Sequence, residues 1–400
     1  MNVLFLTIGK ITSIREQGIY TDLLKQFRDR HHRVYIVNPT ERKENKATDY
    51  RIEEGIHILR VKTGNLTKTN IFEKGISTLL IESLFIKAIK KHLNSIRFDL
   101  VIYSTPPITF EKVVEYVKKR DGAKAYLLLK DIFPQNAVDL NYMRKNGLLY
   151  KYFRSKERKL YQISDYIGCM SKANVEYIIN NNPDINPNKI EVCPNSIMPS
   201  EVLKDESSIK AARLKYNIPL TKVVYIYGGN LGKPQGIDFL IQCLDSNKFN
   251  DKAYFIIAGS GTEYSKIKRY FDMNNPTNAK LIEYLPRQEY NLLVQSCDVG
   301  LIFLDRRFTI PNFPSRLLGY MQASMPVLAA TDTNTDLRSA IEEGKFGFWC
   351  ESGDILAFNK NVKTLIDDKV REDMGNNARV YLENNYTSKH TYDVIIRHFK

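Results

Sequence analysis

The chain has 400 residues, 43% of them hydrophobic, which exceeds what one core accommodates and predicts two domains. Its 59 basic and 45 acidic residues give a net charge of +14, which favours an anionic partner: nucleic acid, an anionic membrane or a phosphorylated small molecule. The five cysteines form no CxxC pair, so the sequence excludes a zinc or disulfide framework. No apolar run approaches the ~20 residues that span a bilayer, and no signal peptide is recognisable. We expect a cytoplasmic protein, at most peripheral to a membrane.

In the first half of the chain, apolar strands alternate with helices. We predict strands at 2–7, 33–37, 99–104, 125–129 and 166–170, and helices at 18–30, 110–119 and 148–163. This alternation is typical of a mostly parallel sheet with helices on both faces, whose ligands bind beyond the carboxyl ends of the strands. Gly9, Gly18, Thr105 and Asp131 lie at such ends.

Asp131 has two readings. Its carboxylate could orient or deprotonate a substrate hydroxyl at the strand end, which is a general-base role. An Asp that precedes Ile-Phe-Pro could equally cap a turn. None of the six histidines lies beside a motif that would make it catalytic.

Two basic stretches suggest contact with a membrane. Residues 76–94 place apolar side chains at helical spacing with lysines at one end, and residues 150–159 combine aromatic and basic side chains. Such helices can lie in the headgroup region of an anionic bilayer. Either one could instead pack its apolar face on a core, and the sequence leaves both possibilities open.

In the second half, the pattern restarts after a predicted linker at 193–196. We predict helices at 207–216 and 237–243, with strands at 222–227, 254–258, 280–283 and 298–303. Glycine-rich loops follow two of these strands, at 228–236 and 259–261, and Lys233 adds a positive charge to the first. Backbone N–H groups in such loops can approach phosphate closely. The loops match neither GxGxxG nor the P-loop, so they do not indicate a dinucleotide or ATP.

The stretch 310–332 predicts an anion site of its own. After two prolines, Ser315 can cap a helix, and Arg316 in the first turn can make a bidentate contact with phosphate oxygens. The helix N-terminus would favour the same anion. The alternative is an ordinary capped helix with a solvated arginine, followed by a strand at 327–330.

Four segments of the second half resemble the nucleotide-binding domain of family 4 glycosyltransferases: Gly229–Lys233 with Gln235-Gly236, Phe255–Glu263, Glu283–Leu304 and Pro314–Asp332. The first half resembles the acceptor domain of bacterial capsule and O-antigen transferases through the segments 16–24 and 130–135. The resemblance implies the GT-B architecture, an α/β fold of two facing Rossmann-like domains with the active site in the cleft between them. We place the domains at 1–195 and 196–385, with the segment 386–400 packing back on the first.

The resemblance also implies roles for individual residues. Lys233 and Arg316 would hold the diphosphate of a UDP-sugar, helped by the N–H groups of residues 315–317, and Tyr284 to Pro286 would flank the base. A helix N-terminus and fixed cations suit the charge that develops on a leaving diphosphate. The full set of donor-binding residues is Gly9, Gly18, Gly229, Asn230, Gly232, Gln235, Gly259, Gly261, Tyr284, Leu285, Pro286, Asn312, Ser315 and Leu317.

The sequence departs from the family pattern at three positions. Pro311 and Gly319 occupy the positions of two glutamates that contact the donor sugar and the ribose, and Gln235 replaces a phosphate-binding lysine. Neighbours such as Asn312 and backbone groups would then hold the donor. The altered sugar contact suits an unusual donor, such as an N-acetylated 6-deoxyamino sugar.

We therefore expect a retaining, metal-independent transferase at the cytoplasmic face of the membrane. It would move a sugar from a UDP-sugar to an undecaprenyl-pyrophosphate-linked saccharide during capsule or O-antigen biosynthesis. No tight Asp-x-Asp cluster argues for a metal, so no cofactor is expected. The alternatives are a GT-B nucleotide-sugar epimerase and a non-catalytic GT-B partner subunit. A nucleic-acid binder would explain the charge, but no nucleic-acid module is recognisable.

Overall fold

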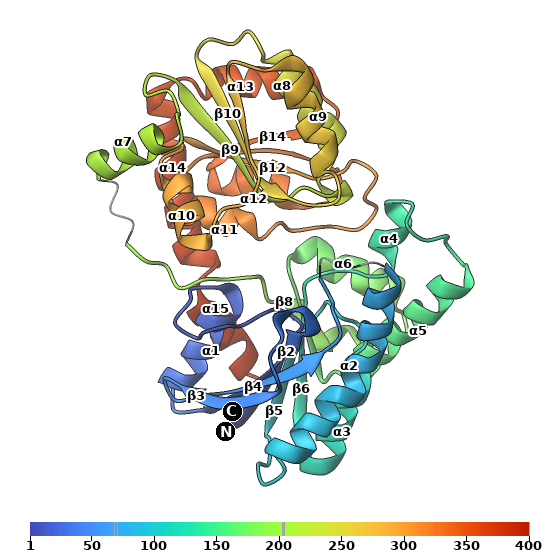
Figure 1. Ribbon diagram of the computed structural model, residues 1–400. Helices are drawn as coiled ribbons and strands as arrows, with labels where there is room; N and C mark the ends of the chain where they lie inside the picture. Colours follow the sequence, from blue (N-terminus) through green and yellow to red (C-terminus); the bar gives the residue numbers. More distant parts are fainter. Residues whose placement is uncertain (68, 70, 202–204, 400) are drawn as a thin grey trace. The chain divides into compact units, whose positions relative to one another are not determined.

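The protein folds as two compact units in a computed structural model that describes residues 1–67, 69, 71–201 and 205–399 (Figure 1). Unit 1 comprises Met1–Met198 and the C-terminal segment from Ser388, and unit 2 comprises Pro199–Thr387. Each unit contains one sheet. Among the described residues, no helix has both the length and the apolar character needed to cross a membrane.

The sheet of unit 1 has eight strands in the order β3-β4-β2-β1-β5-β6-β7-β8. Only β3 runs antiparallel, as the hairpin partner of β4, so the prediction of a mostly parallel sheet is confirmed. β1 lies between β2 and β5, and the chain order therefore reverses beside it. Ligands of open parallel sheets bind at such a switch point, beyond the carboxyl ends of the strands. The strands are β1 (Asn2–Leu6), β2 (Arg33–Glu41), β3 (Asp49–Glu53), β4 (Ile56–Thr63), β5 (Leu100–Ser104), β6 (Lys124–Leu129), β7 (Tyr166–Cys169) and β8 (Ile190–Val192).

Helices cover both faces of this sheet (Figure 1). α1 and α15 share the apolar core of one face, where the rings of Phe27 and Tyr392 are 4.7 Å apart. The ring of Phe85 on α2 stacks on that of Phe110, the residue that precedes α3. The helices are α1 (Ile19–Asp29), α2 (Ile71–His92), α3 (Glu111–Asp121), α4 (Gln135–Asp139), α5 (Leu148–Ile163), α6 (Lys172–Asn181) and α15 (Ser388–Ile396), with 3-10 turns at Arg42–Glu44 and Pro187–Lys189.

The predicted linker at 193–196 is wrong, because this segment packs inside unit 1. The Ser196 hydroxyl lies 2.7 Å from that of Thr391 on α15. The backbone N–H of Met198 donates to the carboxylate of Asp22 on α1. The boundaries of unit 1 therefore fall at 198 and 388 rather than at 195 and 386, and Tyr386 belongs to unit 2.

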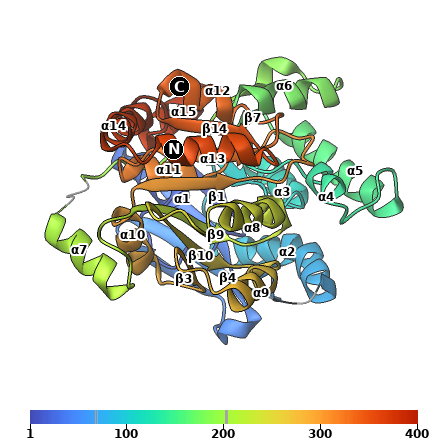
Figure 2. The same cartoon turned by 90° about the horizontal axis from the view of Figure 1, so that it is seen from above.

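Unit 2 contains a six-stranded sheet in the order β11-β10-β9-β12-β13-β14, with every neighbouring pair parallel. Numbered within the unit, this order is 3-2-1-4-5-6, and the switch point lies between β9 and β12. Figure 2 shows the chain from above, with β9, β10 and β14 of this unit labelled. Its strands are β9 (Val223–Asn230), β10 (Ala253–Ser260), β11 (Ala279–Ile282), β12 (Val299–Phe303), β13 (Val327–Thr331) and β14 (Gly347–Glu351).

The helices of unit 2 follow these strands in turn. α8 packs on the central strands through an apolar face that includes Phe239 and Leu240. The helices are α7 (Glu206–Lys215), α8 (Ile237–Ser246), α9 (Tyr264–Asn274), α10 (Arg287–Gln295), α11 (Arg316–Gln322), α12 (Leu337–Gly344), α13 (Ile355–Thr364) and α14 (Asp368–Asn385), with a 3-10 turn at Lys233–Gln235.

Candidate functional site

Two glycine loops lie against each other at the switch point of unit 2. Gly229 and Gly259 are register partners on β9 and β10, and a Cβ on Gly259 would lie 1.8 Å from the carbonyl oxygen of Gly229. A Cβ on Gly261 would likewise lie 2.3 Å from the oxygen of Leu231. Gly229 has a φ of 127°, which L side chains rarely adopt. Glycine is therefore required at these three positions for two backbones to meet beside the site.

Gln235 stabilises the loop after β9. Its side-chain oxygen accepts hydrogen bonds from Asn230 Nδ2 at 3.0 Å and from the N–H of Gly232 at 3.2 Å. These three predicted donor-binding residues thus lie together, and the Gln235 oxygen shapes the loop from within. Lys233 opens the 3-10 turn of the same loop and is half-buried.

Arg316 reaches this loop from the first turn of α11. Its guanidinium lies 4.2 Å from the ring centroid of Tyr227, and its Nη2 lies 3.5 Å from where a Cβ on Gly229 would stand. Nη1 is buried, and among the described residues it has no hydrogen-bond partner. Within the same described part of the chain, no carboxylate forms an ion pair with Arg316. A buried cation without an anion is costly, so this arrangement favours an anionic ligand.

Tyrosines surround the Arg316 guanidinium. Tyr290 of α10 lies against Gly228, where a Cβ would lie 2.0 Å from its hydroxyl. The hydroxyl of Tyr320 on α11 donates to the carbonyls of Ile226 and Leu301. Burial raises the pKa of Tyr290 to about 12, so these rings stay neutral and leave the positive charge uncompensated.

The predicted helix cap at Ser315 is wrong. Ser315 has helical backbone angles, and its side chain makes no capping hydrogen bond. The N–H groups of Leu317 and Leu318 donate to the carbonyls of Pro314 and Ser315, because the helix begins with a tight turn. The N–H of Leu317 is therefore already bonded and does not point to phosphate as predicted.

The remaining predicted donor residues flank this region. Tyr284 and Leu285 follow β11, with Tyr284 69% exposed, and Pro286 precedes the first turn of α10. The Asn312 carbonyl accepts from the hydroxyl of Thr335, whereas its buried Nδ2 has no partner among the described residues. Asn312 therefore offers a donor to a ligand.

The two positions that lack the family glutamates differ sharply. Pro311 is buried, whereas Gly319 lies on the exposed face of α11. A Cβ on Gly319 would meet no atom within 4 Å. A methyl group at 319 would therefore fit without displacing any neighbour.

Unit 1 has a chemically different cluster at its own switch point. Asp131 follows β6, and its backbone N–H donates to the hydroxyl oxygen of Thr105 beyond β5 at 3.2 Å. Burial raises the pKa of Asp131 to about 6, which is the range of a general base. The raised pKa fits the general-base reading of Asp131, and that role stays a prediction.

Tyr20 belongs to this cluster, whereas the side chain of Lys130, the neighbour of Asp131 in the chain, reaches Cys193 instead; the sequence analysis gave neither residue a role. The ring of Tyr20 lies beside Gly9, 3.6 Å from where a Cβ would stand, and burial raises the pKa of Tyr20 to about 12 with a further contribution from the Asp131 charge. Lys130 donates to the carbonyl of Cys193, and burial lowers its pKa to about 8. The one available signal was their position beside predicted residues, Gly18 and Asp131.

Gly9 and Gly18 belong to unit 1, whereas all other predicted donor-binding residues belong to unit 2. The N–H of Gly9 donates to the Thr7 hydroxyl oxygen at 2.9 Å. Gly18 precedes α1 with an extended backbone, φ 174°, and its carbonyl accepts from the N–H of Asp22. Among the described residues, no three His, Cys, Asp or Glu side chains lie together as a candidate metal centre, and metal independence stays a prediction.

Comparisons with known proteins agree with this fold. Residues 208–381 match the family model "Glycosyl transferases group 1". The chain is 25% identical over 328 residues to a probable glycosyltransferase of Pseudomonas aeruginosa, WbjE, covering 80% of this chain and 78% of that protein. It is 21% identical over 140 residues to WcaI of Escherichia coli, a putative colanic acid biosynthesis glycosyl transferase, covering 34% of this chain and 33% of WcaI. The solved structure of Anabaena HepE in complex with UDP superposes with a TM-score of 0.68 at 15% identity, over 100% of this chain and 99% of HepE.

Proposed function

The chain carries a glycosyl transferases group 1 domain of the family 4 type at residues 208–381, with a GT-B fold, and on this premise we propose that it is a retaining transferase that uses a UDP-sugar. The acceptor in this proposal is a saccharide linked to undecaprenyl pyrophosphate, and the product is a precursor of capsular polysaccharide or O-antigen. The name of WbjE, a probable glycosyltransferase, supports sugar transfer, and that of WcaI, a putative colanic acid biosynthesis glycosyl transferase, supports a role in polysaccharide biosynthesis. The reaction needs no metal or other cofactor.

Arg316 is the observation that carries the proposal. Its guanidinium lies beside the glycine loop. Among the described residues, no carboxylate forms an ion pair with it and Nη1 has no hydrogen-bond partner. Arginine binds phosphate through two parallel hydrogen bonds, and removal of water strengthens such bonds. A diphosphate at this place would accept hydrogen bonds from the guanidinium and compensate its positive charge.

The proposed chemistry divides between the two units. When the bond between the anomeric carbon and the diphosphate breaks, negative charge develops on UDP, and Arg316 and Lys233 stabilise it. In unit 1, we assign to Asp131 the role of orienting or deprotonating the acceptor hydroxyl. The pKa of Asp131, about 6, allows it to accept a proton near neutral pH.

The missing glutamates bear on the rival functions. Pro311 offers no side-chain donor or acceptor, and Gly319 has no side chain, although a Cβ there would meet no atom within 4 Å. We propose that Asn312 Nδ2 and loop N–H groups hold the donor in their place. A non-catalytic partner subunit would bind no UDP, and an epimerase would convert a UDP-sugar without any acceptor.

The test is transfer from a panel of UDP-sugars to a lipid-pyrophosphate monosaccharide, followed by mass spectrometry. Wild type should give product with one donor, and Arg316→Ala should reduce it strongly. An exposed arginine of the same unit, Arg269→Ala, is the matched control and should leave the rate unchanged. No product and no UDP binding would favour a partner subunit, and conversion of the donor without acceptor would favour an epimerase.

A further inference from the structure

The first half of α5 projects apolar side chains into solvent. Leu148 is 87% exposed, Leu149 56% and Tyr152 42%, and all three lie in the first two turns. The side chains that α5 buries, Glu157, Leu160 and Tyr161, all belong to its second half. The second half thus anchors the helix in unit 1, while the first half presents two adjacent leucines without a core to cover them.

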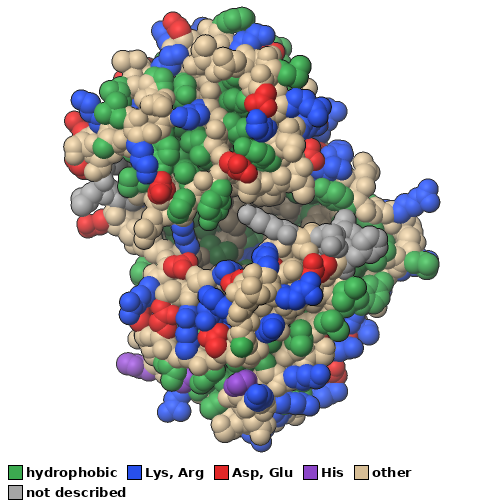
Figure 3. Space-filling model, in the orientation of Figure 1, with side chains coloured by type: hydrophobic (Ala, Val, Ile, Leu, Met, Phe, Trp, Pro, Cys, Tyr) green, Lys and Arg blue, Asp and Glu red, His purple; other side chains and the backbone are tan. Residues whose placement is uncertain are grey.

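Positive charge surrounds these leucines. Arg144, Lys145 and Lys151 are exposed, and none of them forms an ion pair with a described residue. No aspartate or glutamate occurs between residues 140 and 156. We call Leu148, Leu149 and Tyr152 with these three cations the α5 surface. Figure 3 shows hydrophobic and basic side chains side by side at the right-hand margin, where Figure 1 shows α4 and α5.

α2 adds a second exposed apolar group beside α5. Ile76 is 61% exposed, and Leu79 and Leu80 are each 52% exposed. Lys156 Nζ of α5 lies 4.0 Å from the carboxylate of Glu82 on α2, so the two helices border each other. Exposed lysines follow on α2 at 87, 90 and 91.

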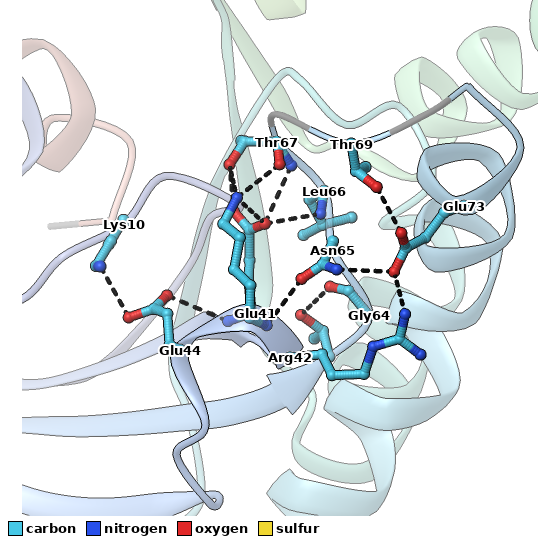
Figure 4. Close-up of polar contacts among 12 residues, drawn as sticks. Lys10, Glu41, Arg42, Glu44, Gly64, Asn65, Leu66, Thr67, Thr69 and Glu73 are labelled. Carbon is cyan, nitrogen blue, oxygen red and sulfur yellow. Dashed lines mark hydrogen bonds and ion pairs between the residues drawn. The ribbon is translucent and has the colours of Figure 1, made fainter.

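A polar network fixes the beginning of α2 (Figure 4). The Glu73 carboxylate in its first turn accepts from Arg42 at 2.7 Å, from Asn65 Nδ2 at 2.8 Å and from the Thr69 hydroxyl. Nearby, the Glu41 carboxylate accepts from two backbone N–H groups of the loop that leads to α2. The exposed apolar group of α2 therefore projects from an anchored helix start.

We propose that the α5 surface, with the adjoining apolar group of α2, is where unit 1 docks on an anionic lipid bilayer. Leucines and a tyrosine would enter the headgroup boundary, and the cations around them would meet lipid phosphates. Charge complementarity favours this occupant, because the three cations have no anionic partner in the described structure. The inference rests on the proposed function in one respect: a lipid-linked acceptor is found at such a surface.

The experiment measures binding of the full chain to vesicles of phosphatidylcholine with and without phosphatidylglycerol. Wild type should bind only the anionic vesicles, and added salt should weaken binding. Leu148→Asp/Leu149→Asp should reduce partition at least about tenfold, since both leucines lose their transfer into the bilayer. Lys145→Glu/Lys151→Glu should remove the preference for phosphatidylglycerol.

The control variant changes two leucines of unit 2 with similar exposure, Leu356 at 80% and Leu214 at 58%. Leu356→Asp/Leu214→Asp should bind vesicles as wild type does. Equal loss in both double variants, or wild-type binding by Leu148→Asp/Leu149→Asp, would overturn the inference. A dimer that sedimentation detects without lipid, and that only Leu148→Asp/Leu149→Asp dissociates, would also overturn the inference. The α5 surface would then be an interface with a second copy of the chain.

A water-soluble acceptor separates this inference from the proposed function. Leu148→Asp/Leu149→Asp should transfer sugar to a soluble saccharide pyrophosphate at the wild-type rate and to the vesicle-embedded acceptor at a reduced rate. Vesicle binding without transfer in either assay would refute the proposed function alone. Transfer to both acceptors at wild-type rates by the variant would refute the docking surface alone.

Discussion

Replacing Asp131 by Asn should stabilise unit 1 while impairing the enzyme. Burial raises the pKa of Asp131 from 3.8 to about 6. A carboxyl whose pKa is higher in the folded state than in the unfolded state destabilises the fold when it is ionised. As far as this carboxyl is concerned, the protein is therefore most stable below pH 3.8, and it loses this stability as the pH rises through about 6. The difference between 3.8 and about 6, at about 1.4 kcal/mol for each pKa unit, amounts to about 3 kcal/mol. The Asn side chain removes this cost and leaves the backbone hydrogen bond to Thr105 in place.

Hydrogen exchange of the amides of β5 and β6 measures this gain. Above about pH 7, the slowest amides of Asp131→Asn should exchange roughly 100-fold more slowly than those of wild type. Near pH 4 the difference should fall to a few-fold, because the wild-type carboxyl is then protonated in the folded state. Peptides from β12 and β13 in unit 2 provide the internal control and should not change.

The activity of the same variant completes the test. Wild-type transfer should rise as the pH increases through about 6, and Asp131→Asn should lose both this rise and most of its rate. Equal protection in the two proteins at both pH values would refute the burial of the charge. A stabilised variant with full activity would refute the role of Asp131 as base.

Three further changes test unit 2. Arg316→Ala should weaken UDP binding, measured by calorimetry, by more than about a hundredfold, since two charge-assisted hydrogen bonds are lost. Arg316→Lys should recover only part of the lost affinity. Wild-type affinity in either variant would contradict the assignment of Arg316 to the diphosphate. Gly261→Ala should lower the free energy of unfolding by roughly 1–3 kcal/mol, because its Cβ would meet the oxygen of Leu231; the fluorescence of Trp349, the one tryptophan of the chain, reports this in urea. Gly319→Ala should raise the free energy of unfolding by about 1 kcal/mol, because the Cβ enters open space and alanine has the higher helix propensity. A lower midpoint of urea unfolding than in wild type would show that the position is not open.

Apolar periodicity predicted most of the fold because burial dominates these elements. α5 extends over Leu148–Ile163, the predicted 148–163, and the central strands of both sheets lie where apolar runs stood. The β3–β4 hairpin was missed because charged residues interrupt its alternation. Its signal was the pair Glu54-Gly55, and both residues have positive φ, 47° and 77°, as a tight hairpin turn requires.

The candidate site was only partly predictable, because residue types are visible in sequence and partners are not. The glycines of the two loops could be identified from the sequence, because a glycine-rich loop directly after a strand indicates a close approach of backbones or of a ligand. The convergence of Tyr227, Tyr290 and Tyr320 on Arg316 was invisible, because they come from β9, α10 and α11. The cap expected at Ser315 failed for a local reason, since the tight first turn already uses the N–H of Leu317.

The two switch points differ in the chemistry that each sheet edge supports. In unit 2, glycines and a cation that has no carboxylate partner among the described residues create a place that favours an anionic ligand, and burial raises the pKa of the neighbouring Tyr290 to about 12. In unit 1, burial raises the pKa of Asp131 to about 6, so its carboxyl can give up or accept a proton near neutral pH. Sugar transfer needs both properties, because one substrate departs as an anion and the other loses a proton. A binding subunit would need only the first, so the activity of Asp131→Asn distinguishes a transferase that uses this carboxylate from a subunit that only binds.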